Sequence, residues 1–552
     1  MADQLLINGR IYTMDAGCPR ASALAVAGER ILAVGDDPAA LRLLLAPGAH
    51  VLDLGGRCVI PGLTDSHIHF AWYAQTLDML DLAGAATLDQ VLDLVAQRAR
   101  ETSPGEWVLG RGWDQERWPE RRFPTAAGLD RVAPVHPVML RAKSGHALVA
   151  NSSALHKAGI TAQTPDPPGG RIGRDAAGCP DGMLFEDSAM KLVADLLPSP
   201  GLEEAAGLLR QAFLHAWRVG LTGIHDMDGT SAFAAYQYLH ARGELGLRVV
   251  KYLPASALDC ALEIGLRAGL GDDWLRVGGL KAFADGALGP RTAAMLAPYE
   301  GQPDNLGILT TDEQALHTLV HKAAAGGLAL AIHAIGDRAN RLALDALSLP
   351  SPPSPPFLPS LPSLPSLPSP PSPPFPPFPK HRIEHVQLLH PADVPRLAAL
   401  GVVASMQPIH ATQDCEMADR YWGERCATAY AWRSLLQAGT LLAFGSDCPV
   451  EDLNPFLGLH AAVTRRRAND GFPGPQGWIP HQRLTVEEAL RAYTLGAAYA
   501  AGLEDRLGSL TPGKLADLVV LDRDIFACDP MDIAHTQVVA TMLGGQFVYG
   551  QV

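Results

Sequence analysis

Short apolar runs alternate with helical stretches through most of the chain. Eight runs have the composition of buried strands: residues 59–67, 221–227, 247–253, 280–284, 328–333, 382–386, 402–406 and 441–445. Helical candidates fall between them, at 201–219, 311–325, 338–347, 391–399 and 429–438. A strand followed by a helix, repeated in this way, predicts an α/β fold with a (β/α)8 TIM barrel over residues 59–504.

The two ends of the chain have a different pattern. Residues 1–58 and 505–552 contain short alternating segments separated by Gly and Asp turns, which is typical of β-strands. Neither end is long enough to form a sandwich alone, so we predict one small composite β-sandwich built from both. The stretch 70–200 is too long for a single crossover and is predicted to be an inserted α+β subdomain, with a strand at 138–142 and hairpin turns within 165–182.

Residues 350–379 consist almost wholly of Pro, Ser, Leu and Phe. Such a low-complexity segment lacks the donors for a helix or a sheet, and it is expected to be a polyproline-like loop. It is either a ligand for an aromatic groove on a partner or an inert expansion, and we favour the expansion. It lies between the fifth helix and the sixth strand, on the barrel face opposite the predicted site, so it need not disturb catalysis.

Composition narrows the classes of protein. The 552 residues are 47% hydrophobic and 18% charged, as in a packed globular enzyme. A formal net charge of -14 argues against nucleic acid or an anionic membrane as partner. The eight cysteines have no Cys-x-x-Cys spacing, and neither a signal peptide nor an apolar stretch of spanning length is recognisable. We therefore expect a cytoplasmic protein with a small-molecule substrate, and a homodimer is a possible assembly.

Six residues that can bind metal or move a proton stand at the ends of the predicted strands: His67, His69, Lys281, His333, His385 and Asp447. A parallel barrel gathers such residues at one mouth. His67 and His69 are two apart, so in a strand they point the same way and can hold one metal ion. Asp447 follows a strongly apolar run, so its carboxylate needs a partner. A metal ion with its bound water is favoured over the alternative, in which Asp447 caps a turn before Pro449.

Lys281 is the unusual member of this set. A buried ammonium among histidines and a divalent cation is expected to lose its proton, and it can then take up CO2 as an anionic carbamate that bridges two metals. The alternative is a lysine paired with Asp285 or with a substrate carboxylate. Asp65 and Ser66, just before the two histidines, are possible partners that orient the ligands.

Other positions have two interpretations each. His146 and His410 can stabilise an oxyanion or hold a substrate, or be loop histidines satisfied by the backbone. Arg291 can clamp a substrate carboxylate or brace its loop through Asp285, and we favour bracing. Trp113, with its neighbouring tryptophans, can form an aromatic wall for an apolar substrate, although packing within the inserted subdomain is favoured.

Several motifs together resemble one family of enzymes: PGLTDSHIH, GLKAFADGALGPRTA, HAIGDRAN, RIEHVQLL, FGSDCPVEDLNP and LTPGKLADLVVLD. They are similar to the amidohydrolase superfamily, and to its amidohydrolase 3 branch with the N-substituted formamide deformylase-like enzymes, over nearly the whole chain apart from 350–379. The resemblance implies a distorted (β/α)8 barrel and a metal-bound hydroxide. It also implies that His67, His69, His333, His385 and Asp447 are ligands, that Lys281 is carbamylated, and that Asp447 takes the proton of the attacking water.

The sequence thus predicts a metal-dependent hydrolase that cleaves a non-peptide C–N bond, such as that of an N-formyl or N-acyl amine, with Asp447 as general base and then acid. One or two divalent ions are expected, with Zn favoured and Fe, Mn or Co also suited to these ligands. The same chemistry also serves an amidine or a lactone. A non-catalytic barrel acting as a regulatory or assembly module is the remaining alternative, and the six filled positions argue against it.

Overall fold

A computed structural model describes residues 1–197, 200–348 and 380–551. The segment predicted to be a proline-rich loop, 350–379, lies outside the described residues. The centre of the molecule is an eight-stranded parallel sheet, in the order β21-β20-β19-β18-β17-β16-β15-β8. Its strands are β8 (Leu63–Ile68), β15 (Leu221–Asp226), β16 (Arg248–Pro254), β17 (Leu275–Phe283), β18 (Leu330–Ala334), β19 (Arg382–His385), β20 (Val403–Met406) and β21 (Leu442–Phe444).

The sheet curls into a nearly closed barrel, which confirms the predicted α/β fold class. Its first and last strands meet at their carboxyl ends, where the Asp447 amide donates to the His67 carbonyl at 2.8 Å and the His69 amide to the Cys448 carbonyl at 2.9 Å. Gly445 makes this approach possible, because a Cβ there would lie 2.5 Å from the His67 nitrogen. The side chains at the ends of β8 and β21 are therefore held side by side.

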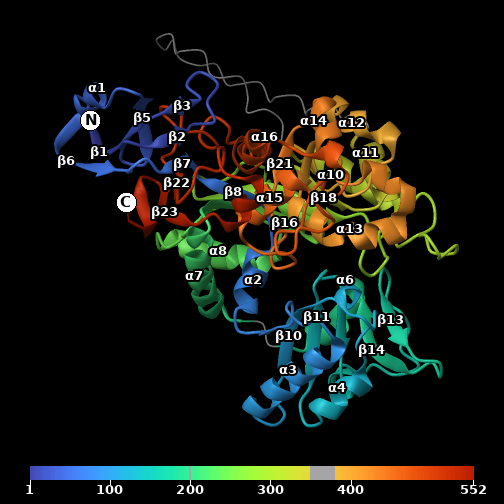
Figure 1. Cartoon of the computed structure of the whole chain (residues 1–552). Helices are drawn as coiled ribbons and strands as arrows, with labels where there is room; N and C mark the ends of the chain where they lie inside the picture. Colours follow the sequence, from blue (N-terminus) through green and yellow to red (C-terminus); the bar gives the residue numbers. More distant parts are fainter. Residues whose placement is uncertain (198–199, 349–379, 552) are drawn as a thin grey trace.

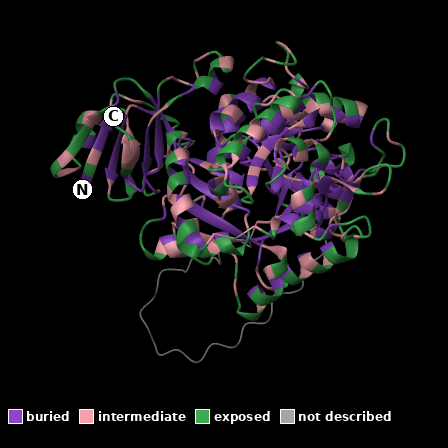
Figure 2. Ribbon diagram, turned by 90° about the horizontal axis from the view of Figure 1, so that it is seen from below, coloured by how far each residue is buried: buried purple, intermediate pink, exposed green. Residues whose placement is uncertain are grey.

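Helices surround the barrel and shield its strands (Figure 1). They include α7 (Leu202–Arg218), α8 (Thr230–Ala241), α10 (Glu313–Ala325), α11 (Asp337–Leu347), α12 (Val394–Ala399), α13 (Pro408–Trp422), α14 (Trp432–Gln437) and α15 (Pro455–Thr464). Figure 2 shows buried strands inside and helices whose outer faces are exposed. Strands covered in this way are apolar on both faces, which is why the sequence showed them as continuous apolar runs.

The run 59–67 was predicted to be one strand, and this was wrong. It is divided at Gly62 into β7 (Cys58–Pro61) and β8, and β7 pairs with β2 (Arg10–Tyr12) and β22 (Leu518–Leu521) outside the barrel. A Cβ on Gly62 would lie 2.3 Å from the Thr222 hydroxyl, so the chain crosses between the two sheets where no side chain fits. Continuous apolar character concealed the break because both strands are buried.

Strands from both termini form a two-layered β-sandwich (Figure 1). One sheet has the order β5-β4-β1-β6, and the other the order β24-β23-β22-β7-β2-β3. The remaining strands are β1 (Ala2–Ile7), β3 (Arg20–Ala21), β4 (Ala23–Ala27), β5 (Arg30–Gly35), β6 (Leu45–Asp53), β23 (Val538–Leu543) and β24 (Gln546–Gly550). Leu24 and Val26 of one sheet pack with Val520 and Met542 of the other.

A third sheet lies in the segment between β8 and β15, with the order β13-β14-β12-β11-β10-β9. It comprises β9 (Leu80–Asp81), β10 (Val108–Trp113), β11 (Val138–Ala142), β12 (Ala147–Ala150), β13 (Arg171–Arg174) and β14 (Pro180–Phe185). The predicted strand at 138–142 is β11, and the predicted hairpin is β13 with β14. Helices α3 (Leu88–Glu101), α4 (Ala126–Val132), α5 (Ser152–Lys157) and α6 (Glu186–Ala194) pack on it, whereas α2 (Phe70–Thr76) packs on α7 of the barrel.

Candidate metal centre

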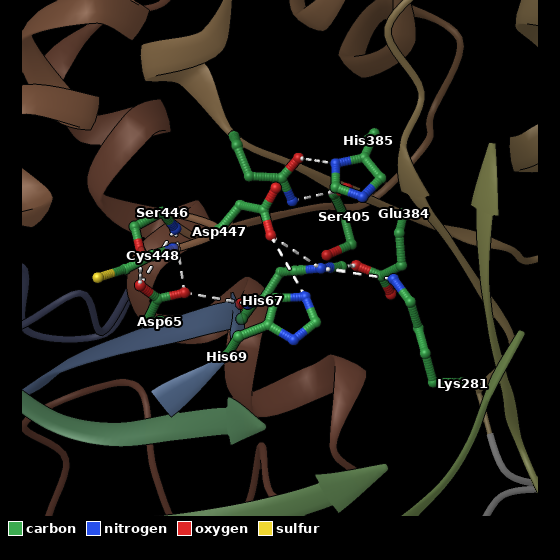
Figure 3. A network of polar contacts seen from close by, with 12 residues as sticks. Asp65, His67, His69, Lys281, Glu384, His385, Ser405, Ser446, Asp447 and Cys448 are labelled. Atoms are coloured by element: carbon green, nitrogen blue, oxygen red, sulfur yellow. Dashed lines mark hydrogen bonds and ion pairs between the residues drawn. The ribbon is translucent and has the colours of Figure 1, made fainter. Parts of the chain in front are cut away.

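The structure brings the six predicted residues together at the carboxyl ends of the barrel strands. Figure 3 shows five of them, namely His67, His69, Lys281, His385 and Asp447. Ligand atoms of His67, His385 and Asp447 all lie within 4.8 Å of one another. The Nε2 of His69 is 3.6 Å from Asp447 Oδ1. The Nζ of Lys281 is 3.4 Å from His67 Nε2, and the ring of His333 is 4.5 Å from the ring of His385.

Each of the four histidines has one ring nitrogen occupied by a protein acceptor. His67 Nδ1 contacts Glu384 at 2.5 Å, and His69 Nδ1 contacts Asp228 at 3.0 Å. His333 Nε2 contacts the Gly286 carbonyl at 3.0 Å, and His385 Nδ1 contacts Gln407 Oε1 at 2.8 Å. An imidazole that donates through one nitrogen presents a lone pair at the other. The donor set therefore fits a divalent cation of the zinc type.

Burial keeps the rings of His67, His333 and His385 neutral. It lowers the pKa of His67 to about 4, with a further contribution from the charge of Lys281, and it lowers the pKa of His333 and His385 well below the usual value. Burial also lowers the pKa of Lys281 to about 8. Neutral imidazoles and an easily deprotonated amine are the forms that bind a cation.

Glu384 and Arg382 form a buried support under His67 that the sequence analysis missed. Arg382 Nε contacts Glu384 Oε1 at 2.5 Å, and the side chains of both residues are 0% exposed. Burial would raise the pKa of Glu384, but Arg382 and His67 lower it far below its ordinary value. The available signal was the alternation in RIEH, because residues two apart in a strand share a face.

Asp65 and Ser66, expected to orient the ligands, act through the backbone. Asp65 accepts from the amides of His67 at 3.0 Å and of Ser446 at 3.0 Å, and it thereby ties β8 to the segment after β21. Burial raises the pKa of Asp65 to about 7. The Ser66 carbonyl accepts from Arg382, while the Ser66 hydroxyl has no hydrogen-bond partner within the described residues.

Asp447 is positioned by its backbone and by His410. Its φ of 60° lies in the left-handed region, as does the φ of 73° at His385, and such backbone strain is often found at functional sites. His410 Nε2 lies 3.3 Å from Asp447 Oδ2, and behind it Glu451 pairs with Lys143 at 2.6 Å. Burial alone would lower the pKa of His410, but its contacts with Asp447 and Glu451 raise it to about 10. A cationic His410 therefore stabilises the carboxylate form of Asp447.

His146 and Asp285 both lie beside this cluster. His146 Nδ1 contacts Glu186 at 2.7 Å, and its ring is 5.4 Å from the ring of His333. Burial opposes protonation of His146, but Glu186 raises its pKa. Asp285 accepts from three backbone amides, those of Ala294, Ile335 and Gly336, at 2.8 to 3.0 Å.

The favoured interpretation of Arg291, bracing through Asp285, was wrong. Within the described residues no contact joins the two side chains, because backbone amides already satisfy the Asp285 carboxylate. The guanidinium of Arg291 lies instead over the ring of Tyr421, 5.4 Å from its centroid. Trp113 is 0% exposed and donates from Nε1 to the Leu140 carbonyl, so it packs in the core of the third sheet. It also borders a hollow beside the cluster.

Two connected hollows meet at the cluster. The inner one has a volume of about 80 Å³ and is lined by Trp113, Phe123, Lys143, His410, Met417 and Glu451. The outer one opens past Trp72, Arg141, Met190 and Phe283. Both include His146, His333, His385 and Asp447. A substrate in either hollow would reach the same reacting centre.

Comparison with known proteins agrees with this arrangement. The Amidohydro_3 model, described as amidohydrolase family, matches residues 50–549. The chain belongs to the amidohydrolase family. Over its full length it is 34% identical to the protein LONG AFTER FAR-RED 3 of Arabidopsis thaliana, covering 92% of it, and 31% identical to N-substituted formamide deformylase of Arthrobacter pascens, covering 98%.

A solved protein of similar architecture is an uncharacterized metal-dependent hydrolase from Pyrococcus horikoshii, with a TM-score of 0.74 and 28% identity over 96% of this chain and 99% of that one. Membership of the amidohydrolase family confirms the resemblance predicted from the motifs. It also gives the cluster of His and Asp side chains its context, because the solved protein from Pyrococcus horikoshii is described as a metal-dependent hydrolase.

Proposed function

We propose that this amidohydrolase cleaves a non-peptide C–N bond, that of an amide such as an N-formyl or N-acyl amine. The observation that carries the proposal is the set of four imidazoles, three of them buried and that of His69 half-buried, each held at one nitrogen and grouped around Asp447. The similarity to an N-substituted formamide deformylase supports an amide substrate.

His67, His69, His333, His385, Asp447 and Lys281 would hold one or two divalent ions, with zinc best suited to imidazole and carboxylate ligands and Fe, Mn or Co also suited. Such an ion would supply Lewis acidity, activating a water molecule and polarising the amide carbonyl.

Asp447 is the proton carrier in this proposal. Burial would raise its pKa, but the contact with His410 lowers it below the usual value. It therefore stays ionised at neutral pH and can accept the proton of the attacking water. It then delivers that proton to the leaving amine, so that amide and water give a carboxylic acid and an amine.

His146 is suited to stabilise the oxygen on which charge develops. Its Nδ1 is engaged by Glu186 and its ring lines both hollows, so Nε2 is the nitrogen left to donate when the ring is protonated. His410 acts through Asp447 by holding the carboxylate in position.

Lys281 is proposed to carry a carbamate. The neutral amine would add to CO2 to give a carbamate anion, with release of one proton. The carbamate would provide an oxygen ligand at a position where an ammonium group would repel the cations. Its position 3.4 Å from His67 Nε2 supports this role.

The test is a measurement of metal content together with hydrolysis of a panel of N-formyl and N-acyl amines before and after chelation. We expect activity to disappear on chelation and to return with zinc, and with bicarbonate if Lys281 is carbamylated. Full activity in metal-free protein would refute the mechanism.

A further inference from the structure

The outer hollow contains a guanidinium for which the described part of the chain supplies no hydrogen bond or ion pair. Arg141 lies in β11, is half-buried, and lines the hollow beside Trp72 and Met190. Its guanidinium carbon lies over the Trp72 ring, 5.6 Å from the centroid. Across residues 1–197, 200–348 and 380–551 no acceptor is within bonding distance of it.

The neighbouring charged side chains of the hollow are already engaged. Glu186 contacts His146 at 2.7 Å, and Asp228 contacts His69 at 3.0 Å. Asp187, the acid whose charge acts on Arg141, pairs with Lys191 at 2.5 Å. Within the described residues, Arg141 therefore faces the hollow with no carboxylate of the chain within bonding distance.

A half-buried guanidinium without a partner is unfavourable, because it has lost water without gaining an acceptor. Burial lowers the pKa of Arg141, with Asp187 acting in the opposite direction, yet a guanidinium remains charged at neutral pH. Its planar fork of donors matches the two oxygens of a carboxylate. The Trp72 ring below it limits the orientations that the guanidinium can adopt, so less entropy is lost when a carboxylate binds.

The position of Arg141 is linked to the metal centre through Trp72. The Trp72 amide donates to Asp228 Oδ2 at 2.9 Å, and the other oxygen of Asp228 contacts His69 Nδ1. The Trp72 ring lies 5.8 Å from the His69 ring. Gly145 packs closely against the Trp72 ring, since a Cβ on this glycine would lie 3.1 Å from it. One aromatic side chain therefore separates the guanidinium from a predicted ligand.

We propose that Arg141 binds a carboxylate on the substrate, so that the amides cleaved by this protein are anionic, with the carboxylate remote from the scissile C–N bond. This inference rests on the proposed function, and it names the class of substrate that the sequence left open. Apolar contact would come from Met190 and Phe283, which is 40% exposed beside His333.

The test compares two substrates that differ in one carboxylate, N-formyl-ε-aminocaproate and N-formylpentylamine, in the wild-type metal-loaded protein and in Arg141→Met. The matched control is Arg171→Met, because Arg171 also stacks on an aromatic ring, that of Phe185 at 4.2 Å, but lies outside both hollows. We expect Arg141→Met to lower the ratio of kcat/KM for the acid over the amine by about tenfold to hundredfold, mainly through KM. Arg171→Met should leave the ratio unchanged, and Arg141→Lys should restore part of it.

Binding of hexanoate, measured by titration calorimetry, separates this inference from the proposed function. Weaker binding to Arg141→Met than to wild type supports the carboxylate site even if neither amide is hydrolysed, in which case the proposed function fails alone. An unchanged substrate ratio in Arg141→Met, or equal binding of hexanoate by wild type and Arg141→Met, would overturn the role of Arg141. In that case, hydrolysis of either amide would still support the proposed function.

Discussion

The buried pair of Arg382 and Glu384 offers the sharpest test of how the protein scaffold supports a metal ion. Replacing Glu384 by Gln removes the negative charge that lies 2.5 Å from His67 Nδ1, and the imidazole should become a poorer donor to a cation at Nε2. Loss of such a partner weakens metal affinity by about tenfold to hundredfold.

The same substitution leaves Arg382 without its counter-charge. Both side chains are 0% exposed, so an uncompensated guanidinium should reduce the free energy of unfolding of the metal-free protein by about 3 kcal/mol. The contacts of Arg382 with His225 at 2.7 Å and with Ser405 at 2.6 Å do not supply a negative charge. Two effects, on metal affinity and on stability, are therefore expected from one change.

The assays are a competition titration with a chromogenic chelator for zinc affinity and urea unfolding of the metal-free protein. The double variant Arg382→Met with Glu384→Gln should recover stability but not affinity. Asp517→Asn is the matched control, since Asp517 forms a buried pair with Arg248 at 2.6 Å where the sandwich meets β16. It should lower stability and leave zinc affinity unchanged. Wild-type zinc affinity in Glu384→Gln, or its recovery in the double variant, would refute the reasoning.

Three further predictions concern the centre and the barrel around it. His410→Asn should raise the pKa of Asp447, because the carboxylate loses the cation 3.3 Å away. The acidic limb of the pH profile of kcat/KM, which reports protonation of Asp447, should then move up by about one pH unit. An unmoved limb would count against Asp447 as the proton acceptor. Gly445→Ala should lower the free energy of unfolding, measured in urea, by about 2 kcal/mol, because the added Cβ would clash with the His67 backbone. Gly207→Ala is the control: this glycine lies in a helix with open space around it, so the substitution should be neutral or stabilising. Zinc at a hundred times its Kd should increase the free energy of unfolding by about 2.7 kcal/mol, and the increase should shrink in Glu384→Gln assayed at the same zinc concentration.

Much of the fold follows from local pattern. Strands of a covered barrel are apolar on both faces, and parallel strands place the residues after them at one mouth. From these two facts the sequence alone predicts that His67, Lys281, His385 and Asp447 share one centre. The predicted strand at 138–142 and the hairpin after it likewise depended on short-range signals, namely a short apolar run and turns rich in Gly and Pro.

Contacts between distant segments could not be predicted in this way. The break at Gly62 depends on the side chain of Thr222, and the support of His67 by Glu384 depends on how β8 and β19 face each other across the barrel. The role expected for Arg291 was wrong for the same reason, because amides from other segments had already satisfied Asp285. Periodicity along the chain determined which elements form and which residues end them. Only the tertiary structure decided which polar groups pair, because hydrogen-bond partners are selected by distance in space, and the sequence contains no measure of that distance.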